Sequence, residues 1–303
     1  MSILLLGKDG QVGWQLQRSL APHGKVVACG RAECDLADPE QIRAVVRAVR
    51  PGVIVNATAY TAVDKAESEP ALARRINAEA PAILAEEALR LDALLVHYST
   101  DYVYDGRKSS AYVESDPTAP QSVYGHTKLA GEEAIRAAGG KSLIFRTSWV
   151  FGARGNNFVK TILRLARERD SLGVVDDQVG SPTPAALIAT VTGIALAMTR
   201  CGQRLEKGEN RLYHLAAANP VSWHAFATTI LQLAEQMPGF VLRLKPDAIR
   251  AITTPEYPTP AVRPANSRLD CARLESDFGL QMPDWQPYLA RMLQLLALKQ
   301  NGY

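Results

Sequence analysis

The stretch SILLLGKDGQVG, from Ser2 to Gly13, joins a short apolar run to a turn rich in glycine. An apolar run of this length that ends at a glycine is typical of a buried strand, and the residues from Gln11 onward have the apolar periodicity of a helix. Gly7 allows the tight turn, Gly10 lets the backbone approach a pyrophosphate, and Gly13 lets the helix pack on the strand. The stretch therefore predicts the first unit of a dinucleotide-binding fold; the alternative is a plain glycine turn.

Apolar runs and amphipathic stretches alternate further along the chain. Pro39 opens a helix at its first turn, and an alanine-rich stretch predicts a long helix from Ala71 to Leu91. Buried strands are expected at residues 25–30, 52–59, 93–100 and 142–152. Strands that alternate with helices indicate a parallel sheet with helices on both faces. We therefore predict an α/β protein with a Rossmann-like doubly wound parallel sheet.

The pattern changes after Gly152. Proline becomes frequent, above all between Pro255 and Pro264, and the alternation is less regular. Helices are expected at residues 158–167, 185–198, 223–235 and 285–298, and strands at residues 172–178 and 211–217. We therefore expect a dinucleotide-binding domain at residues 1–152, with elements that return from about 185–216. Residues 153–303 are expected to form a smaller, partly interwoven α/β substrate-binding lobe.

The composition excludes several classes of protein. The chain has 303 residues, 47% of them hydrophobic, and a net charge of +3, and its Lys and Arg residues are scattered, so no nucleic-acid partner is expected. The N-terminus lacks the features of a signal peptide, and no apolar run approaches the roughly 20 residues of a membrane span. The four cysteines and five histidines show no metal-ligand spacing. We therefore expect a cytoplasmic protein with reduced thiols and no metal, in which the histidines are structural or solvated.

The stretch SVYGHTKLAGEEAI, from Ser122 to Ile135, places a tyrosine four residues before a lysine. If it is helical, Tyr124 and Lys128 lie on one face, and an ammonium near the phenol would lower the pKa of the tyrosine. Such a pair can deliver a proton at neutral pH; alternatively, Tyr124 packs and Lys128 is solvated. Tyr104 and Lys108 have the same spacing, but a turn signal at Asp105-Gly106 separates them, so the chemistry favours Tyr124.

Hydroxyl groups follow the strand expected at residues 93–100. Ligands bind at the carboxyl ends of strands in such sheets, and this strand ends in Ser99 and Thr100, followed by Asp101. A hydroxyl there can hold a carbonyl oxygen while Tyr124 protonates it, and only one of the two hydroxyls can point into the crevice. The alternative is that this hydroxyl caps the loop.

The residues after the second strand bear on the choice of cofactor. An acidic residue at this position would favour the free 2′-hydroxyl of NAD, whereas this chain has Arg31, which suits a 2′-phosphate. We therefore expect NADPH, although Glu33 lies two residues further on and Arg31 as a solvated loop charge is an equal alternative. Asp35 and Leu36 follow and are expected near the adenine; residues 59–61 end the third strand beside the same crevice.

Together, these motifs resemble the extended short-chain dehydrogenase/reductase superfamily, and most closely its family of dTDP-4-dehydrorhamnose reductases. The resemblance extends from Leu4 to about Asp270. The stretches that carry it are LLLGKDGQVGWQLQ, NATAYTAVDKAE, STDYVYDG, YGHTKLAGE, RTSWVFG, DDQVGSPT and RPANSRLD. Their combination is far more specific than any one of them.

The resemblance implies a reaction. NADPH, with NADH as the alternative, passes a hydride to C4 of a dTDP-linked 4-keto-6-deoxy sugar, dTDP-4-dehydro-L-rhamnose, and the product is dTDP-L-rhamnose, a nucleotide sugar used in carbohydrate biosynthesis such as that of lipopolysaccharide. Tyr124 donates the proton, Lys128 lowers its pKa and binds the nicotinamide ribose, and Thr100 orients the ketone. The implied cofactor contacts include Gly10, Gln11, Val12, Asp35, Leu36, Ala59, Tyr60 and Thr61. The implied substrate contacts are Thr100, Asp101, Trp149, Phe158, Arg263 and Asn266.

Some of these assignments have alternatives. Trp149 and Phe158 could frame a base or sugar, but an aromatic residue after a strand ordinarily packs in the core. Arg263 is expected to bind the diphosphate with Asn266 as a polar partner, unless both belong to a solvated proline-rich loop. Some members of the family form a homodimer through a metal held by glutamates; here one of those positions is Gln15, and an amide is a poorer ligand than a carboxylate, so metal bridging is in doubt.

Two other functions are consistent with the same motifs. The first is a different sugar-nucleotide epimerase or reductase of the superfamily, which would use the same tyrosine and lysine. A dehydratase fits less well, because Asp101 is followed by Tyr102 and the required acid–base carboxylate pair is incomplete. The second is a non-catalytic regulatory subunit, since fold does not fix function. Such a subunit has no need of the tyrosine and lysine that are both present here.

Overall fold

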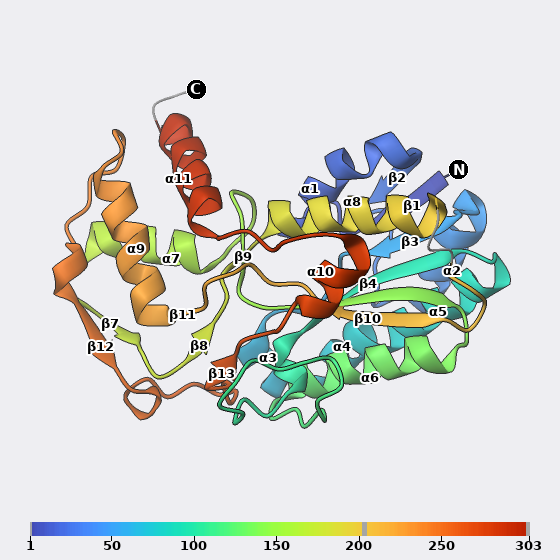
Figure 1. The fold of residues 1–303 in the computed structure, drawn as a ribbon, viewed down its shortest axis with the longest axis horizontal. Helices are drawn as coiled ribbons and strands as arrows, with labels where there is room; N and C mark the ends of the chain where they lie inside the picture. The colour runs from blue at the N-terminus through green and yellow to red at the C-terminus, as the bar shows by residue number, and fades with distance from the viewer. Residues whose placement is uncertain (1, 202–204, 301–303) are drawn as a thin grey trace.

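The computed structural model describes residues 2–201 and 205–300. Its centre is a six-stranded sheet in the order β10-β5-β4-β3-β1-β2, and every neighbouring pair is parallel (Figure 1). This confirms the predicted Rossmann-like parallel sheet. The strands are β1 (Ser2–Leu6), β2 (Lys25–Cys29), β3 (Val53–Asn56), β4 (Leu94–Thr100), β5 (Lys141–Thr147) and β10 (Asn210–His214).

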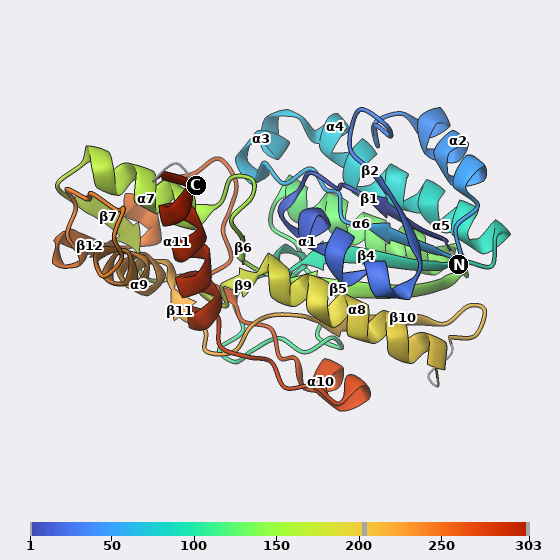
Figure 2. The same ribbon diagram turned by 90° about the horizontal axis from the view of Figure 1, so that it is seen from above.

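Two hydrophobic layers cover the two faces of this sheet. In β1, Ile3 and Leu5 belong to one layer and Leu4 and Leu6 to the other, because successive side chains of a strand point to opposite faces. Helices α1 (Gln11–Ser19) and α8 (Ala185–Cys201) lie on the first face, while α2 (Pro39–Val49), α5 (Ala80–Arg90) and α6 (Val123–Ala137) lie on the second (Figure 2). A sheet buried on both faces explains why its strands read as continuous apolar runs.

A smaller lobe is built from elements after β5. Its strands form pairs and a triplet: β7 (Leu172–Val175) with β12 (Ile249–Ile252), β6 (Val150–Phe151) with β9 (Thr183–Pro184), and β8 (Val179–Gly180) between β11 (Val221–Ser222) and β13 (Asn266–Ser267). Helices α7 (Phe158–Glu168), α9 (Trp223–Glu235) and α11 (Gln286–Gln300) pack beside them (Figure 1). Between these elements the chain returns to the large sheet as α8 and β10, so the two lobes are interwoven.

The long helix expected from Ala71 to Leu91 is interrupted. The structure has α4 (Pro70–Arg74), a π-helical turn (Arg75–Glu79) and α5. Proline at position 81 has no N–H to donate to the carbonyl of Asn77, four residues earlier, and this accounts for the wider turn. Gly131 of α6 meets the same carbonyl so closely that a Cβ there would lie 2.2 Å from it.

Other elements were not foreseen from the sequence. These are the helices α3 (Val63–Ser68) and α10 (Ala272–Phe278), the strands β8, β9, β11, β12 and β13, and four 3₁₀ turns, Ala21–His23, Asp101–Val103, Pro246–Ala248 and Thr254–Glu256. They are short, and their positions depend on contacts with distant parts of the chain. Within residues 2–201 and 205–300, no helix has the length and apolarity needed to cross a membrane.

Candidate active site

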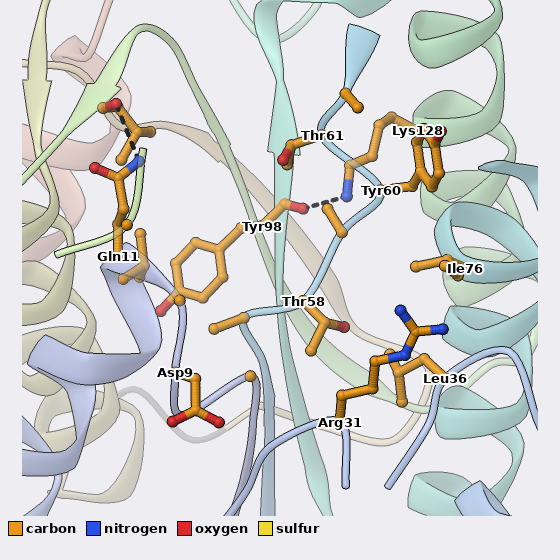
Figure 3. A pocket seen from close by; sticks show the side chains of 18 of the residues that line it. Asp9, Gln11, Arg31, Leu36, Thr58, Tyr60, Thr61, Ile76, Tyr98 and Lys128 are labelled. Carbon is orange, nitrogen blue, oxygen red and sulfur yellow. Dashed lines mark hydrogen bonds between the residues drawn. The ribbon is translucent and has the colours of Figure 1, made fainter. Parts of the chain in front are cut away.

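A cleft of about 830 Å³ lies at the carboxyl ends of β1 to β4 (Figure 3). Its wall includes residues from the glycine turn, from the ends of β2 and β3, and from α6. Among the residues predicted to bind a cofactor, those that line it are Gly7, Gly10, Gln11, Val12, Arg31, Asp35, Leu36, Ala59, Tyr60, Thr61, Tyr124 and Lys128. The structure therefore brings these residues, which are spread over more than a hundred positions of the chain, to one side of the sheet.

The glycine turn has the geometry expected from its sequence. Gly7 has a φ of +88°, which favours glycine, and its carbonyl accepts a hydrogen bond of 3.0 Å from the N–H of Gly10. A Cβ on Gly13 would lie 1.9 Å from that carbonyl, so Gly13 serves the packing of α1 on the turn. Gly10 is the N-cap of α1 and brings no side chain of its own, which leaves the first amides of the helix directed at the cleft.

Gln11 connects the glycine turn to the smaller lobe. Its side-chain oxygen accepts a hydrogen bond of 2.8 Å from Asn157, and its nitrogen lies 3.4 Å from the carbonyl oxygen of Val150. Asn157 is the N-cap of α7. One amide side chain therefore fixes the start of α1 relative to the segment that leads from β6 into α7.

The end of the cleft near β2 carries balanced charges. Arg31 is 78% exposed and forms an ion pair of 3.2 Å with Asp35. Glu33, which had been expected to compete with Arg31 in the choice of cofactor, is instead engaged with Lys8 and accepts a hydrogen bond of 2.8 Å from the N–H of Gly30. Arg31 is thus the cation on this rim that lies mostly in solvent.

Helix α6 carries Tyr124 and Lys128 in its first two turns. Ser122 caps the helix by accepting a hydrogen bond of 3.1 Å from the N–H of Gly125. Both side chains are buried, with 9% of Tyr124 and 1% of Lys128 exposed, so the alternative of a solvated lysine does not hold. The side-chain nitrogen of Lys128 donates a hydrogen bond of 2.6 Å to the carbonyl of Tyr98, on β4 (Figure 3).

The pKa of Tyr124 differs from the expectation. We expected Lys128 to lower it, but burial raises the pKa of Tyr124 well above its ordinary value, even though the interaction with the Thr100 hydroxyl works in the opposite direction. Lys128 does not lower the pKa of Tyr124 because its nitrogen is hydrogen-bonded to β4. The ionisable neighbours that act on the phenol are instead Asp101 and Tyr102. Burial also lowers the pKa of Lys128, to about 8.

Thr100 and Asp101 follow one another at the end of β4. The Thr100 hydroxyl accepts a hydrogen bond of 3.2 Å from the N–H of Tyr102, which is the loop-capping role considered above, and it also contacts Asp101 and Tyr124. Asp101 is 3% exposed, and burial raises its pKa to about 6 despite hydrogen bonds from Ser267 and Thr100. One hydroxyl therefore joins the phenol and a buried carboxyl group.

The two aromatic residues predicted to touch substrate pack against the smaller lobe. Trp149 has a φ of +48°, and its ring stacks on Trp223 of α9 with centroids 3.5 Å apart. The ring of Phe158 lies 4.5 Å from the same tryptophan. Both belong to the rim of the large hydrophobic core, outside the wall of the cleft. Core packing, the alternative named from the sequence, describes both of them.

Arg263 and Asn266 are held by protein groups. Arg263 forms an ion pair of 2.7 Å with Asp64 of α3. The Asn266 amide donates to the carbonyls of Lys108 and Ser110, 2.7 Å each, and its oxygen accepts hydrogen bonds from Arg268. The amide of Asn266 thus holds two loops together, and its contact with substrate stays a prediction.

Sequence reasoning missed the polar groups behind Lys128. His97, expected to be structural or solvated, is 1% exposed, and its Nε2 lies 3.2 Å from the Lys128 nitrogen. Its Nδ1 lies 3.1 Å from the side-chain nitrogen of Asn56, at the end of β3. The position of Asn56 at a strand end was visible in the sequence, but its contact with His97 depends on the register between β3 and β4.

Comparison with known proteins agrees with this architecture. The family model described as "RmlD substrate binding domain" matches residues 1–298. A dTDP-4-dehydrorhamnose reductase of Burkholderia thailandensis is 48% identical over 94% of this chain and 96% of its own, and one of Escherichia coli is 47% identical over 98% of both chains. A solved dTDP-4-dehydrorhamnose reductase of Bacillus anthracis, in complex with NADP, has a TM-score of 0.86 and 34% identity over 96% of this chain and 98% of its own. The chain therefore belongs to the RmlD family, that of the dTDP-4-dehydrorhamnose reductases, which are oxidoreductases.

Proposed function

We propose that this enzyme reduces the C4 ketone of dTDP-4-dehydro-L-rhamnose to give dTDP-L-rhamnose, with Tyr124 as the proton donor. The observation that supports this most directly is the position of Tyr124 and Lys128 in the wall of one cleft with the glycine turn. A buried phenol that keeps its proton at neutral pH is suited to give that proton to an oxygen that gains negative charge. The identity to reductases of this kind over nearly the whole chain supports the choice of substrate.

The cleft fits a dinucleotide cofactor. The turn around Gly7 and the first amides of α1 can receive a pyrophosphate, and residues 59–61 and Leu36 line the wall on the way to Arg31. NADPH would supply the hydride. Arg31 lies where the 2′-phosphate is expected and suits it as a charged, forked donor, and the NADP complex of the Bacillus anthracis relative supports this choice. NADH remains the alternative that the same cleft could hold.

We assign three groups to the ketone. The hydroxyls of Thr100 and Tyr124, which contact one another, would hold the carbonyl oxygen, and the protonation comes from Tyr124. Lys128, fixed by the carbonyl of Tyr98, would bind the nicotinamide ribose and, while it is protonated, supply the positive charge that favours the phenolate. Asp101, joined to Thr100 by a hydrogen bond of 3.0 Å, would contact the sugar.

The diphosphate of the substrate would be bound by Arg263. Its guanidinium is paired with Asp64, so Asp64 holds it in place until a second anion shares it. Trp149 and Phe158 would limit the sugar end of the site through the surface they form with Trp223. We expect Asn266 to act indirectly, by positioning the loop that carries Arg263. We do not include a metal-bridged homodimer in the proposal, because Gln15 offers an amide where a carboxylate would be needed.

Replacement of Tyr124 by phenylalanine tests the proposal. The Tyr124→Phe variant should lose about 10²- to 10⁴-fold in kcat, because it keeps the ring and loses the proton, while the Kd for NADPH changes by less than about threefold. The measurement is NADPH oxidation followed by absorbance, with dTDP-4-dehydro-L-rhamnose supplied by the preceding enzymes, and NADPH binding followed by fluorescence. Tyr102→Phe is the matched control, since the Tyr102 ring lies edge-on to Tyr124, with centroids 5.4 Å apart. A Tyr124→Phe enzyme with near-normal turnover would contradict the assignment.

A further inference from the structure

Asn56 and His97 form a buried polar pair behind Lys128. Asn56 ends β3, His97 lies on β4, and the two are direct partners in the parallel register, so their side chains point to the same face of the sheet. Each is 1% exposed. Helix α6 covers this face and carries Lys128 onto the pair, where its nitrogen lies 3.2 Å from Nε2 of His97.

The hydrogen bonds of Asn56 fix the orientation of its amide. The backbone N–H of Thr58 lies 3.2 Å from the side-chain oxygen of Asn56, and the Thr58 hydroxyl also donates to it. A backbone N–H can only donate, so the atom facing it must be the oxygen, and the NH₂ group must face His97. That NH₂ group is a donor, and the partner at 3.1 Å, Nδ1 of His97, must therefore accept.

The proton of His97 then has one place to lie. Burial lowers the pKa of His97 well below its ordinary value, so the ring is neutral and carries a single N–H. Because Nδ1 accepts from Asn56, this proton is on Nε2, which faces Lys128. An ammonium at Lys128 would bring its own hydrogens against this N–H, whereas a neutral amine can accept the bond with its lone pair and still donate to the carbonyl of Tyr98 at 2.6 Å.

We propose that His97 is a positioning residue that favours the neutral amine of Lys128, because Asn56 holds the ring in its Nε2–H tautomer. The significance of this pair rests on the proposed function, in which Lys128 acts beside the cofactor and Tyr124. When a protonated Lys128 gives its proton to the Tyr124 phenolate, the amine that results is the form that His97 accommodates.

The other ionisable groups around Lys128 do not remove this preference. Tyr124 and Glu132 lie on the same helix, one turn to either side. The Glu132 carboxylate favours a charged lysine, but it is already bound by Arg146 of β5 through hydrogen bonds of 2.9 and 2.6 Å. Within β4, His97 is the ionisable side chain at the Lys128 nitrogen and Asp101 lies at the strand end near Tyr124.

The tautomer can be observed directly in the unmodified protein. With ¹⁵N-labelled histidine, long-range ¹H–¹⁵N spectra distinguish a ring protonated at Nε2 from one protonated at Nδ1, and the chain has five histidines to resolve. The His97→Gln variant identifies the resonance, and His126→Gln, at an exposed position of α6, is the matched control. We expect the Nε2–H pattern for His97. An Nδ1–H pattern overturns the proposal, whatever the outcome for the Tyr124→Phe enzyme, because no turnover is involved.

A second variant reverses the proton arrangement. In Asn56→Asp, a carboxylate can still accept from Thr58, but it would accept from Nδ1–H of His97 as well, which turns Nε2 into an acceptor for an ammonium. The titration midpoint of Lys128, followed by the ¹³Cε shift of labelled lysine, should rise by about one pH unit or more. The double variant Asn56→Asp/His97→Phe keeps the added charge and lacks the ring, and most of the rise should disappear. An equal rise in both variants assigns the effect to charge alone and overturns the role of His97.

Discussion

The chain contains two Tyr-x-x-x-Lys pairs, and the structure places them in different surroundings. Tyr124 and Lys128 lie in the first two turns of α6, and both line the cleft. Tyr104 follows the 3₁₀ turn at the end of β4, and Lys108 lies beyond a turn in which Gly106 has a φ of +74°. The Lys108 ammonium is paired with Asp116 rather than with Tyr104. Identical spacing therefore has no fixed meaning, because the backbone between the two residues decides whether they share a face.

The two tyrosines also differ in the charges beside them. Tyr104 is 1% exposed, its hydroxyl accepts a hydrogen bond of 2.7 Å from Arg146, and it lies 2.7 Å from Nε2 of His214. Burial raises the pKa of both phenols, but Arg146 opposes this shift at Tyr104, whereas Asp101 adds to it at Tyr124. The hydroxyl of Tyr104 is hydrogen-bonded to groups inside the protein, while Tyr124 lines a cleft. We take this difference in access to separate a structural tyrosine from a catalytic one.

The largest effect is expected when the lysine of each Tyr-x-x-x-Lys pair is replaced. Lys128→Met keeps the length of the side chain and removes the charge and the donor, and we expect kcat to fall by about 10²- to 10³-fold because both the ribose contact and the proton source are lost. Lys108→Met should change kcat by less than about twofold, since its partner Asp116 lies in the same loop. Steady-state kinetics with NADPH at pH 7.5 compare the two variants. Equal losses of kcat in both variants would contradict the assignment of Tyr124 and Lys128 as the catalytic pair.

The same comparison shows how much the sequence could predict. Local patterns in the sequence predict the glycine turn, the strands β1 to β5 and the helix after Ser122. The rule that ligands bind at the carboxyl ends of parallel strands then indicates where the site lies. The pairing of Tyr124 with Lys128 was predicted from helical spacing, and their roles in the reaction from the family resemblance. These features could be read from the sequence because each is encoded within about 15 residues.

The remaining features depend on partners that are distant along the chain. Asp64 pairs with Arg263 across 199 positions, and the amide of Asn266 binds Lys108 across 158. The packing of α6 on β4 determines that the Lys128 side chain points toward the carbonyl of Tyr98. It thereby also determines the surroundings that set the pKa of Tyr124. No local pattern contains these distances, so the substrate side of the site and the charge balance around the phenol could be described only from the structure.

An aspartate lies near each tyrosine, and the two should respond to pH in opposite directions. Burial raises the pKa of Asp101 to about 6, so between about pH 4 and pH 6 the folded protein binds more protons there than the unfolded chain, and this group's contribution to stability falls as pH rises. The Asp101→Asn variant removes this penalty. Its free energy of unfolding relative to the native protein should rise by about 2 kcal/mol between pH 4.5 and pH 7.5. Urea unfolding at the two pH values measures the difference.

Asp105 is the control for this prediction. A hydrogen bond from Tyr112 holds the pKa of Asp105 below its ordinary value, so its contribution is present at neutral pH and is lost as pH falls. Asp105→Asn should therefore be less stable than the native protein at pH 7.5, and this deficit should shrink toward pH 3. If both variants shift stability in the same direction with pH, the assigned environments of the two aspartates are wrong.

The smallest expected effect concerns Tyr104 itself. Tyr104→Phe leaves the stacking on Tyr112, whose ring centroid is 4.2 Å away, and removes the oxygen that accepts from Arg146. A buried guanidinium that loses one acceptor while keeping its two bonds to Glu132 should lower the free energy of unfolding by about 1–3 kcal/mol. At the same time kcat should stay within about twofold of the native value, in contrast to Tyr124→Phe. Chemical denaturation and kinetics on the same preparation test both parts, and a large loss of kcat without loss of stability would place Tyr104, too, in the catalytic machinery.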